Sequence, residues 1–357
     1  MKQYDVIIVG ASFAGLSCAR ALLAGGKKVM ILELKKDIRK HIHTTGIIVD
    51  EAFEEWKPKK SLLKKINKVK LYSPSLEKIS IQSDDYTFYA TDTGELIYEY
   101  YKEILELGGE CRLDYNFKGA EYNNDSKLYS LANLKISAPI IVGADGVFSP
   151  VAKYFGLGRN SRFLYGVEYE FSYDVLEGKE LEGFHCFTNQ DVSLGYLGWI
   201  VPGVKTVQVG LATFQTEKPE IDRFLNSISD VFNFDKKYLL TTRGGVIPTN
   251  GVVEPFYQNN VFLVGDAAGT MSPLTAGGIH TAMRYGRKLG EHISQNFDNP
   301  EENLEKYIKT LPKFKFKRLL SKAYVSLCKN WMLNLLFKTK IIFPIAKIVF
   351  FLKKKLK

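Results

Sequence analysis

The chain has 357 residues, 45% of them hydrophobic, which is enough to bury a full core and to form two domains. Its formal net charge of +10 is unevenly distributed. Residues 306–357 contain 15 Lys and Arg and no Asp or Glu, whereas residues 1–305 carry 34 basic and 39 acidic residues, a net charge of −5. This division argues against a nucleic-acid-binding protein and favours a basic segment that meets an anionic surface.

The four cysteines lack the spacing of a metal site and any regular pairing pattern, which favours free thiols in a reducing compartment. Asp5 lies close to the start, and the apolar run at residues 6–9 is too short for the core of a signal peptide. We therefore expect the body of the protein to be cytoplasmic.

The chain begins with a strand–helix–strand pattern. An apolar strand is predicted at residues 4–9, a helix at 13–23 and a second apolar strand at 28–34. Runs of this kind are typical of a parallel, doubly wound sheet. The fold class is therefore α/β, with a Rossmann-like domain at the start of the chain.

Antiparallel strands follow. Residues 68–72 and 78–82 flank a Pro-Ser turn and predict a hairpin, and residues 165–173 and 207–213 alternate in the period-two pattern of a half-exposed strand. Parallel-type strands return at 140–143 and 261–265. We therefore expect a discontinuous dinucleotide domain with an inserted antiparallel-sheet substrate domain and a C-terminal helical tail. The expected boundaries are 1–67, 90–160 and 250–300 for the first domain, 68–89 and 161–249 for the second, and 301–357 for the basic tail.

A dinucleotide fingerprint opens the chain. Gly10 permits a tight turn, Gly15 allows close packing of helix on strand, and the first amides of the helix face a pyrophosphate. Glu33, at the end of the second strand, is placed to accept hydrogen bonds from ribose hydroxyls. Ser12 replaces the middle glycine of the pattern. The expected cofactor-binding residues of this motif are Gly10, Ser12, Phe13, Ala14, Gly15 and Glu33.

Two further glycine-rich turns follow apolar strands. One contains Asp145 and Gly146. The other contains Gly265 and Asp266, and is followed by a helix that begins after a second glycine pair. An acid at a strand end can bind a polyol such as a ribityl chain, and free amides at a helix start can meet the electron-rich edge of a flavin. These turns add Asp145, Gly146, Gly265, Asp266, Gly277, Gly278 and Ile279 to the expected cofactor site.

The order and separation of the three motifs resemble those of the flavoprotein group that includes aromatic hydroxylases, halogenases and geranylgeranyl reductases. The resemblance implies FAD as cofactor, with the turn of Asp145 and Gly146 bracing it, Asp266 on the ribityl chain and the amides of residues 277–279 against the isoalloxazine. A single fingerprint implies that the electron donor, NAD(P)H or ferredoxin, binds only transiently.

One stretch resembles the aromatic signature of the geranylgeranyl reductases. It contains Tyr196, Trp199 and Pro202, then Val209 and Gly210 after six residues. The resemblance implies an aromatic wall along a prenyl chain, so Tyr196 and Trp199 are the candidate catalytic residues. The stretch departs from the family by one extra residue between the two aromatics and by Val201 where the family has Phe.

Other positions depart from the branch. Its members carry an Arg-Cys-Gly stretch after the second strand, whereas this chain has residues 43–46, His-Thr-Thr-Gly, so no active-site thiol is carried over. His41 and His43 are spaced as two metal ligands could be on a strand. Without a third ligand nearby, they are interpreted as surface or flavin-edge residues, and no metal is expected.

The tail ends in an apolar run, residues 341–352, followed by four lysines. Twelve residues do not span a bilayer, which takes about 20. Such a segment suits the plane of an anionic membrane, and the alternative is a helix packed on the body with a solvated basic end. We expect peripheral association with the inner face of the cell membrane.

These features predict an FAD-dependent reductase that hydrogenates C=C bonds of geranylgeranyl chains in lipids or lipid precursors. One alternative is an FAD-dependent monooxygenase, a hydroxylase or halogenase, acting on an aromatic or isoprenoid substrate. Another is a flavin-binding carrier or scaffold without turnover.

Overall fold

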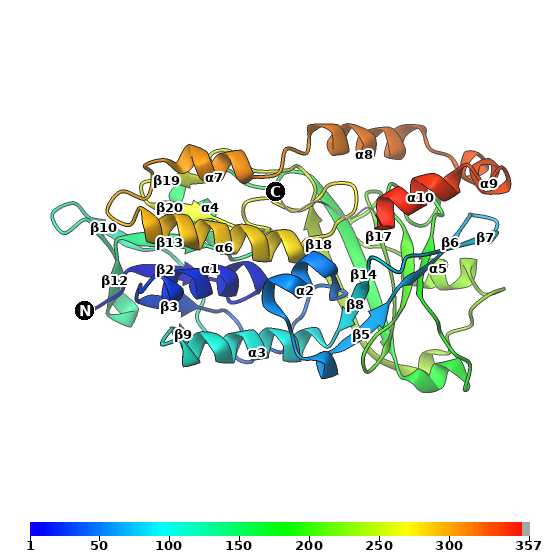
Figure 1. Ribbon diagram of the computed structural model, residues 1–357, viewed down its shortest axis with the longest axis horizontal. Helices are drawn as coiled ribbons and strands as arrows, with labels where there is room; N and C mark the ends of the chain where they lie inside the picture. Colours follow the sequence, from blue (N-terminus) through cyan, green and yellow to red (C-terminus); the bar gives the residue numbers. More distant parts are fainter. Residues whose placement is uncertain (352–357) are drawn as a thin grey trace. The chain divides into compact units, whose positions relative to one another are not determined.

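The computed structural model describes residues 1–351 and divides the chain into two compact units (Figure 1). Both units are discontinuous in sequence. Unit 1 comprises Met1–His41, Gly94–Phe163 and Ile247–Phe316, and unit 2 comprises Ile42–Thr93, Leu164–Val246 and Lys317–Lys357. The second unit is thus assembled from segments inserted into the first and from the end of the chain.

Unit 1 is built on a six-stranded sheet. Its strands, in spatial order, are β19 (Tyr257–Gln258), β20 (Val261–Leu263), β13 (Ile140–Gly143), β2 (Val6–Val9), β3 (Val29–Leu32) and β9 (Glu110–Arg112). All neighbours are parallel except β19 and β20. Every residue of β2, β3, β13 and β20 is buried, as expected for a parallel sheet covered on both faces.

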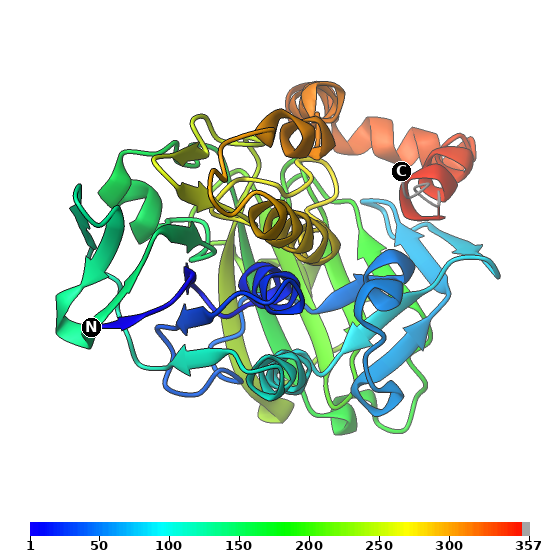
Figure 2. The same ribbon diagram turned by 60° about the vertical axis from the view of Figure 1, so that its left-hand side comes forward.

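Helices α1 (Phe13–Ala24) and α6 (Ile279–Gln295) pack unusually close together within this unit (Figure 2). A Cβ atom at Gly286 would lie 2.3 Å from the carbonyl oxygen of Ala14, and one at Gly290 would lie 2.5 Å from that of Cys18. Two glycines on one face of α6 therefore allow the backbones to touch. The remaining helices of the unit are α3 (Thr93–Glu106), α4 (Pro150–Phe155) and α7 (Leu304–Thr310).

A small second sheet completes unit 1. Its order is β1 (Lys2–Gln3), β12 (Ile136–Ala138), β11 (Leu128–Leu131) and β10 (Glu121–Asn123). It leads directly into β13 of the larger sheet.

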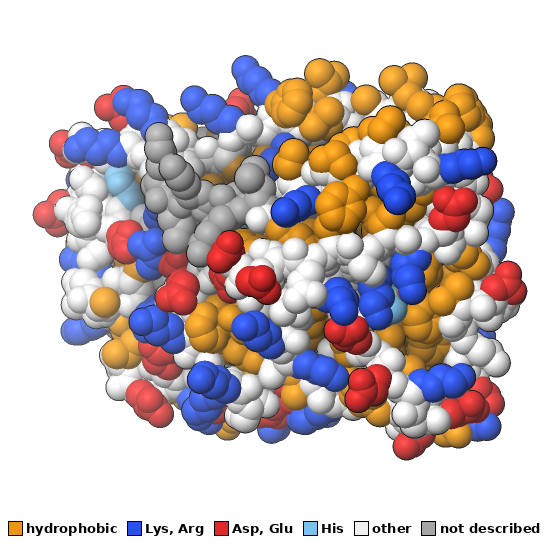
Figure 3. Space-filling view, turned by 45° about the vertical axis from the view of Figure 1, so that its right-hand side comes forward, with side chains coloured by type: hydrophobic (Ala, Val, Ile, Leu, Met, Phe, Trp, Pro, Cys, Tyr) orange, Lys and Arg blue, Asp and Glu red, His pale blue; other side chains and the backbone are white. Residues whose placement is uncertain are grey.

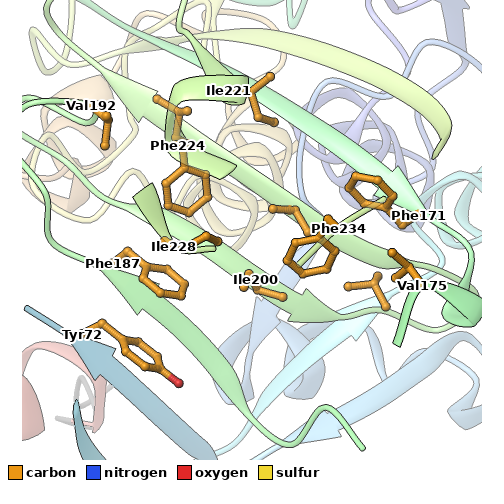
Figure 4. Packing of buried hydrophobic residues seen from close by; sticks show 13 residues of the cluster. Tyr72, Phe171, Val175, Phe187, Val192, Ile200, Ile221, Phe224, Ile228 and Phe234 are labelled. Carbon is orange, nitrogen blue, oxygen red and sulfur yellow. The ribbon is translucent and has the colours of Figure 1, made fainter. Parts of the chain in front are cut away.

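Unit 2 is built on a seven-stranded sheet, in which only the pair β15 and β6 is parallel among the pairs whose register is defined. Its order is β18 (Leu239–Pro248), β14 (Phe163–Phe171), β17 (Val207–Thr213), β16 (Gly198–Pro202), β15 (Phe184–Phe187), β6 (Lys68–Tyr72) and β7 (Lys78–Gln82). One face carries an apolar core that includes Ile200, Val209 and Phe224, the last from α5 (Ile221–Ser227) (Figure 4).

A three-stranded sheet of order β4 (Ile47–Val49), β8 (Phe88–Thr91) and β5 (Leu63–Ile66) also belongs to unit 2, with α2 (Asp50–Trp56) beside β4. The expected domain boundaries fell at 67/68 and 89/90, whereas the units divide at 41/42 and 93/94. The reason is the pairing of β4 and β5 with β8, which places these strands in a sheet of their own in unit 2 and not in the parallel sheet of unit 1.

The C-terminal helices α8 (Lys315–Leu327), α9 (Asn330–Lys338) and α10 (Ile342–Phe351) contact unit 2 through specific side chains. Asn334 accepts hydrogen bonds from the amide and hydroxyl of Ser75, both at 3.1 Å. The ring of Phe351 lies 5.7 Å from that of Phe88 and 6.4 Å from that of Tyr86, between ring centroids. The tail is thus folded onto the unit, while the four terminal lysines lie outside the described residues.

The fold class predicted from the sequence is confirmed: a discontinuous Rossmann-like domain, an inserted antiparallel sheet and C-terminal helices. The hairpin of β6 and β7 has the predicted bounds, and α1 extends only one residue further than predicted.

Candidate cofactor site and substrate sheet

Three strand ends meet at one edge of the parallel sheet. β2, β13 and β20 are neighbours, so the turns that begin at Gly10, Ala144 and Gly265 follow the same edge. Gly10 has φ +107°, and a Cβ atom there would lie 2.2 Å from the carbonyl oxygen of Ala144. Only glycine therefore fits, because both the backbone conformation and the neighbouring turn exclude a side chain.

Helix α1 begins with free amides. Ser12 is its N-cap, makes no side-chain cap hydrogen bond and is exposed, and no acidic residue lies in the first turn. A Cβ atom at Gly15 would lie 1.9 Å from the carbonyl oxygen of Gly10, so the helix starts tightly against the turn. Amides left open at the positive end of a helix fit a pyrophosphate.

Glu33 braces this turn from the neighbouring strand. Its side chain is buried, Oε2 accepts a hydrogen bond from the amide of Ala11 at 2.7 Å, and Oε1 accepts one from the amide of Lys35 at 2.9 Å. Each carboxylate oxygen has a further lone pair, so hydroxyl groups of a ribose can still donate to it.

The thiol of Cys111, on β9, remains protonated. Burial, with a smaller effect of Glu33, raises its pKa to about 12.

Asp145 organises the start of α4. Its carboxylate accepts hydrogen bonds from the hydroxyl of Ser149 at 2.6 Å and from the amide of Val151 at 2.8 Å, while Ser149 Oγ caps Ala152. Burial raises the pKa of Asp145, and the two hydrogen bonds oppose the shift. Gly146 has φ +85° and open space around it. The acid thus shapes the turn, and the glycine leaves its surface free.

Asn160 ties the second and third turns together. Its side-chain amide donates to the carbonyl of Val147 at 2.9 Å and to that of Asp266 at 2.8 Å. Asp266 is half-buried, and burial raises the pKa of its carboxyl to about 6. Sequence reasoning missed Asn160, because its partner Asp266 lies 106 residues further along the chain.

Helix α6 starts at Ile279, with Gly278 as its N-cap and no acidic residue in its first turn. A Cβ atom at Gly278 would lie 2.4 Å from Cε of Met271, so the start of the helix packs on the turn that follows β20. Gly277 has only ordinary contacts. The thirteen predicted cofactor residues all belong to unit 1, and their helix starts and strand ends fit the phosphates and sugar of a dinucleotide.

In unit 2, the predicted aromatic residue Trp199 lies over a glycine. Trp199 on β16 is directly opposite Gly210 on β17, and a Cβ atom at Gly210 would lie 2.6 Å from Cζ2 of the indole. The indole Nε1 donates to Oε2 of Glu168, on the next strand β14, at 2.7 Å. The Trp and Gly of the signature are therefore cross-strand partners, and the glycine makes room for the ring.

Glu168 is the centre of a polar cluster that sequence reasoning did not identify. It is only 4% exposed. Oε2 also accepts a hydrogen bond from the hydroxyl of Thr45 at 2.6 Å, and Oε1 accepts one from Nε of Arg243 at 2.7 Å. Nη2 of Arg243 lies between Glu168 and Glu170, 2.7 Å from the second carboxylate. The sequence did offer one signal for this cluster. The alternation of β14 places the acidic residue 168 on the face that points away from the apolar core.

Tyr196, the other predicted aromatic residue, lies in the loop before β16 and is half-buried. Burial raises the pKa of its phenol. The preceding Gly195 has φ +74°, and its amide donates to Oε1 of Gln190, whose side-chain nitrogen donates to the hydroxyl of Tyr324 on α8 at 2.8 Å. The loop that carries Tyr196 is thus held by a C-terminal helix.

No group of three His, Cys, Asp or Glu side chains within residues 1–351 is arranged to hold a metal ion. The exposed His43 instead donates through Nδ1 to the carbonyl of Gly244 at 2.9 Å.

Comparison with known proteins agrees with this geometry. Residues 127–310 match the family described as FAD binding domain, and residues 4–134 match the pyridine nucleotide-disulphide oxidoreductase family. Digeranylgeranylglycerophospholipid reductase of Methanocaldococcus jannaschii is 29% identical over 336 residues, 89% of this chain and 84% of that protein. The resemblance to geranylgeranyl reductases drawn from the sequence is confirmed.

Two solved structures show the same fold. A geranylgeranyl bacteriochlorophyll reductase-like protein from Thermoplasma acidophilum has a TM-score of 0.81 at 18% identity, covering 95% of this chain and 91% of that chain. CtdE in complex with FAD has a TM-score of 0.69 at 16% identity, covering 95% and 99%. The match to the FAD binding domain spans more than half of the residues of this chain, so the chain belongs to the FAD binding domain family.

Proposed function

We propose that the protein is an FAD-dependent reductase that hydrogenates carbon–carbon double bonds of geranylgeranyl chains in lipids or lipid precursors. The observation that carries this proposal is the arrangement of Trp199 over Gly210, which gives the aromatic signature a definite structural form. A relative named digeranylgeranylglycerophospholipid reductase aligns with 89% of the chain, which supports the reductase branch independently.

In this function unit 1 holds the cofactor. The amides of α1 would hold the pyrophosphate, Glu33 would accept from the adenosine ribose, Asp266 would accept from the ribityl chain, and the amides of residues 277–279 would hold the isoalloxazine. When bound, FAD supplies a hydride to one carbon of the alkene. The electron donor, NAD(P)H or ferredoxin, binds transiently, since the sequence contains one dinucleotide fingerprint.

The other alkene carbon takes a proton, and Tyr196 is the proposed donor. A phenol is protonated at neutral pH, so the hydroxyl carries a proton that the reaction can use. Burial raises its pKa, which makes it a weaker acid, so the transfer must be driven by the negative charge that develops on the alkene carbon. Trp199 forms part of an apolar wall along the prenyl chain. Hydride and proton together add two hydrogens to each double bond.

The test is anaerobic. Purified protein with its FAD reduced by dithionite is mixed with a geranylgeranylated glycerophospholipid, and flavin absorbance is followed together with product mass. We expect reoxidation of the flavin with a gain of two hydrogens per reduced bond, and none with the fully saturated lipid. If the flavin stays reduced until air is admitted, and the lipid then gains an oxygen atom, the protein is a monooxygenase. If neither reaction occurs with any prenyl acceptor, a carrier without turnover remains.

We also propose that the protein binds an anionic membrane through its C-terminal helices. None of the helices within residues 1–351 combines the length and hydropathy needed to cross a bilayer. Large apolar side chains are nevertheless exposed among lysines along α8–α10 (Figure 3). They are Phe316, Leu319, Leu320, Leu327, Trp331, Leu335, Ile341, Phe343, Ile345, Ile348 and Val349. Apolar area beside basic charge supports binding in the plane of an anionic interface.

The exposed apolar surface extends beyond the segment 341–352, which the sequence predicted to contact the membrane. Phe316, Leu327 and Trp331 are each about two-thirds exposed, and replacing all three with Glu should abolish co-sedimentation with phosphatidylglycerol vesicles. Leu240→Glu, at a residue 61% exposed on β18, is the matched control and should bind like the parent. Equal sedimentation of the triple variant and the control contradicts the proposal.

A further inference from the structure

A row of directly opposed residues crosses four strands of the seven-stranded sheet in unit 2. Cys186 on β15 faces Trp199 on β16, Trp199 faces Gly210 on β17, and Gly210 faces Glu168 on β14. Residues directly opposite one another share a face of the sheet. Their neighbours Ile200 and Val209 lie in the apolar core, so this row occupies the other face.

The indole of Trp199 reaches along this row to a carboxylate two strands away. It passes over Gly210, which has no side chain, and ends on Oε2 of Glu168. The same oxygen accepts a hydrogen bond from the hydroxyl of Thr45, in the segment 43–46. One buried carboxylate oxygen therefore joins Trp199 to a segment that lies 123 residues before Glu168 in the sequence.

A buried ion pair is weak evidence that a carboxylate serves stability. Apolar side chains of similar volume are commonly as stabilising as a buried ion pair, because removing two charges from water offsets much of their attraction. The charge of Glu168 also requires a counter-charge, which Arg243 supplies with a side chain that is 17% exposed. The cluster fixes the orientation of two side chains, because Trp199 and Thr45 must both donate to the same oxygen.

We propose that Glu168 is a positioning residue for the prenyl substrate, which fixes the Trp199 indole and the segment 43–46 on one face of the sheet. The inference rests on the proposed reductase function. Glu170 provides the matched comparison, because it lies 2.7 Å from Nη2 of the same Arg243 and is on the same strand. Glu170 contacts Arg243, whereas Trp199 and Thr45 donate to Glu168.

Glu168→Gln tests the role with almost no change in volume. If the amide oxygen faces Trp199 and Thr45, its NH2 group meets the Nε donor of Arg243, and if the amide is reversed, the NH2 group meets the other two donors. The first orientation sets the NH2 group against the Arg243 guanidinium and displaces the side chain that holds the indole. The second removes the acceptor of the indole itself, so the indole should move in either case. We expect KM for a geranylgeranylated glycerophospholipid to rise about tenfold with kcat changed less than about threefold. Glu170→Gln should leave both within about twofold of the parent.

Tryptophan fluorescence provides a readout that is independent of turnover. The chain has three tryptophans, and subtraction of the Trp199→Phe spectrum isolates Trp199. Its emission should shift to longer wavelength in Glu168→Gln and not in Glu170→Gln. Thr45→Val, which removes one donor and keeps the Arg243 pair, should raise KM about threefold and protects the test against poor folding of the first variant.

The outcomes are separable. A parent that reduces no prenyl chain refutes the proposed function, while the fluorescence shift still tests whether Glu168 holds Trp199. Unchanged Trp199 emission in Glu168→Gln, or equal KM values for Glu168→Gln and Glu170→Gln with an active parent, refutes the positioning role. A loss of kcat without a change in KM refutes it as well, because the carboxylate would then act on the chemical step.

Discussion

The two units reach their functional geometry in different ways. In unit 1 the candidate cofactor site consists of backbone: turns after three neighbouring strands, glycines that permit those turns, and free amides at helix starts. In unit 2 the polar cluster on the seven-stranded sheet consists of side chains, and Thr45, Glu168 and Arg243 come from three separate segments. A site made of backbone leaves a local motif in the sequence, whereas a site made of side chains depends on pairings that no local pattern records.

The largest effect should follow from adding one methyl group to the backbone site. Gly10→Ala places a Cβ 2.2 Å from the carbonyl oxygen of Ala144 at φ +107°. Strain and overpacking together should lower the free energy of unfolding by about 2–5 kcal/mol and abolish FAD retention. Flavin absorbance after gel filtration and chemical denaturation measure the two effects.

Gly26→Ala is the control for backbone strain alone. Gly26 also has a positive φ, +74°, but nothing lies within 4 Å of the added atom. It should lower stability by about 1 kcal/mol and keep its FAD. If both variants retain FAD equally, close approach of the turn to Ala144 is not what makes Gly10 necessary.

The side-chain site should respond more gently to the same change. Gly210→Ala places a Cβ 2.6 Å from the Trp199 ring and 2.8 Å from the carbonyl oxygen of Val167, so both must shift. These contacts are longer than the 2.2 Å contact at Gly10, and Gly210 does not have the positive φ that adds strain there. We expect a loss of about 1–3 kcal/mol in stability and a higher KM for prenyl lipid, with FAD retained. Gly166→Ala, where the nearest atom is at 3.7 Å on the adjacent strand, is the control and should change KM little. Loss of FAD from Gly210→Ala would remove the distinction between the units.

The same distinction explains what could be predicted from the sequence. The βαβ pattern, the hairpin of β6 and β7 and the alternation of β14 are local, and they predicted the fold class and the elements. Gly10 and Glu33 follow from a spacing rule, and the structure brings them to one turn through the amide of Ala11.

What could not be predicted depends on distant partners. Glu168 meets Thr45 across 123 residues and Arg243 across 75, so alternation indicated only that the acid faces away from the core. The helix α9 likewise reaches Ser75 across 259 residues, which a basic, apolar tail does not reveal. The roles of individual cofactor residues and of Tyr196 and Trp199 stay predictions.

The smallest effect concerns Asp266, where a side chain takes part in the backbone site. Burial raises the pKa of its carboxyl from an ordinary 3.8 to about 6, so between these pH values the folded state binds more protons than the unfolded state. Stability from this group is therefore lost as pH rises through that range. Burial lowers the pKa of His185 from 6.5 to about 4, which gives the opposite dependence of stability on pH, so only a difference between variants isolates Asp266.

The test compares Asp266→Asn with the parent, both freed of FAD. Relative to the parent, the unfolding free energy of the variant should rise by about 1 kcal/mol between pH 4 and 6, after allowance for partial exposure. A difference in unfolding free energy that does not vary with pH would mean that the carboxyl is solvated like an ordinary surface acid, and that its place at the strand end does not hold it ready for a hydroxyl-rich partner.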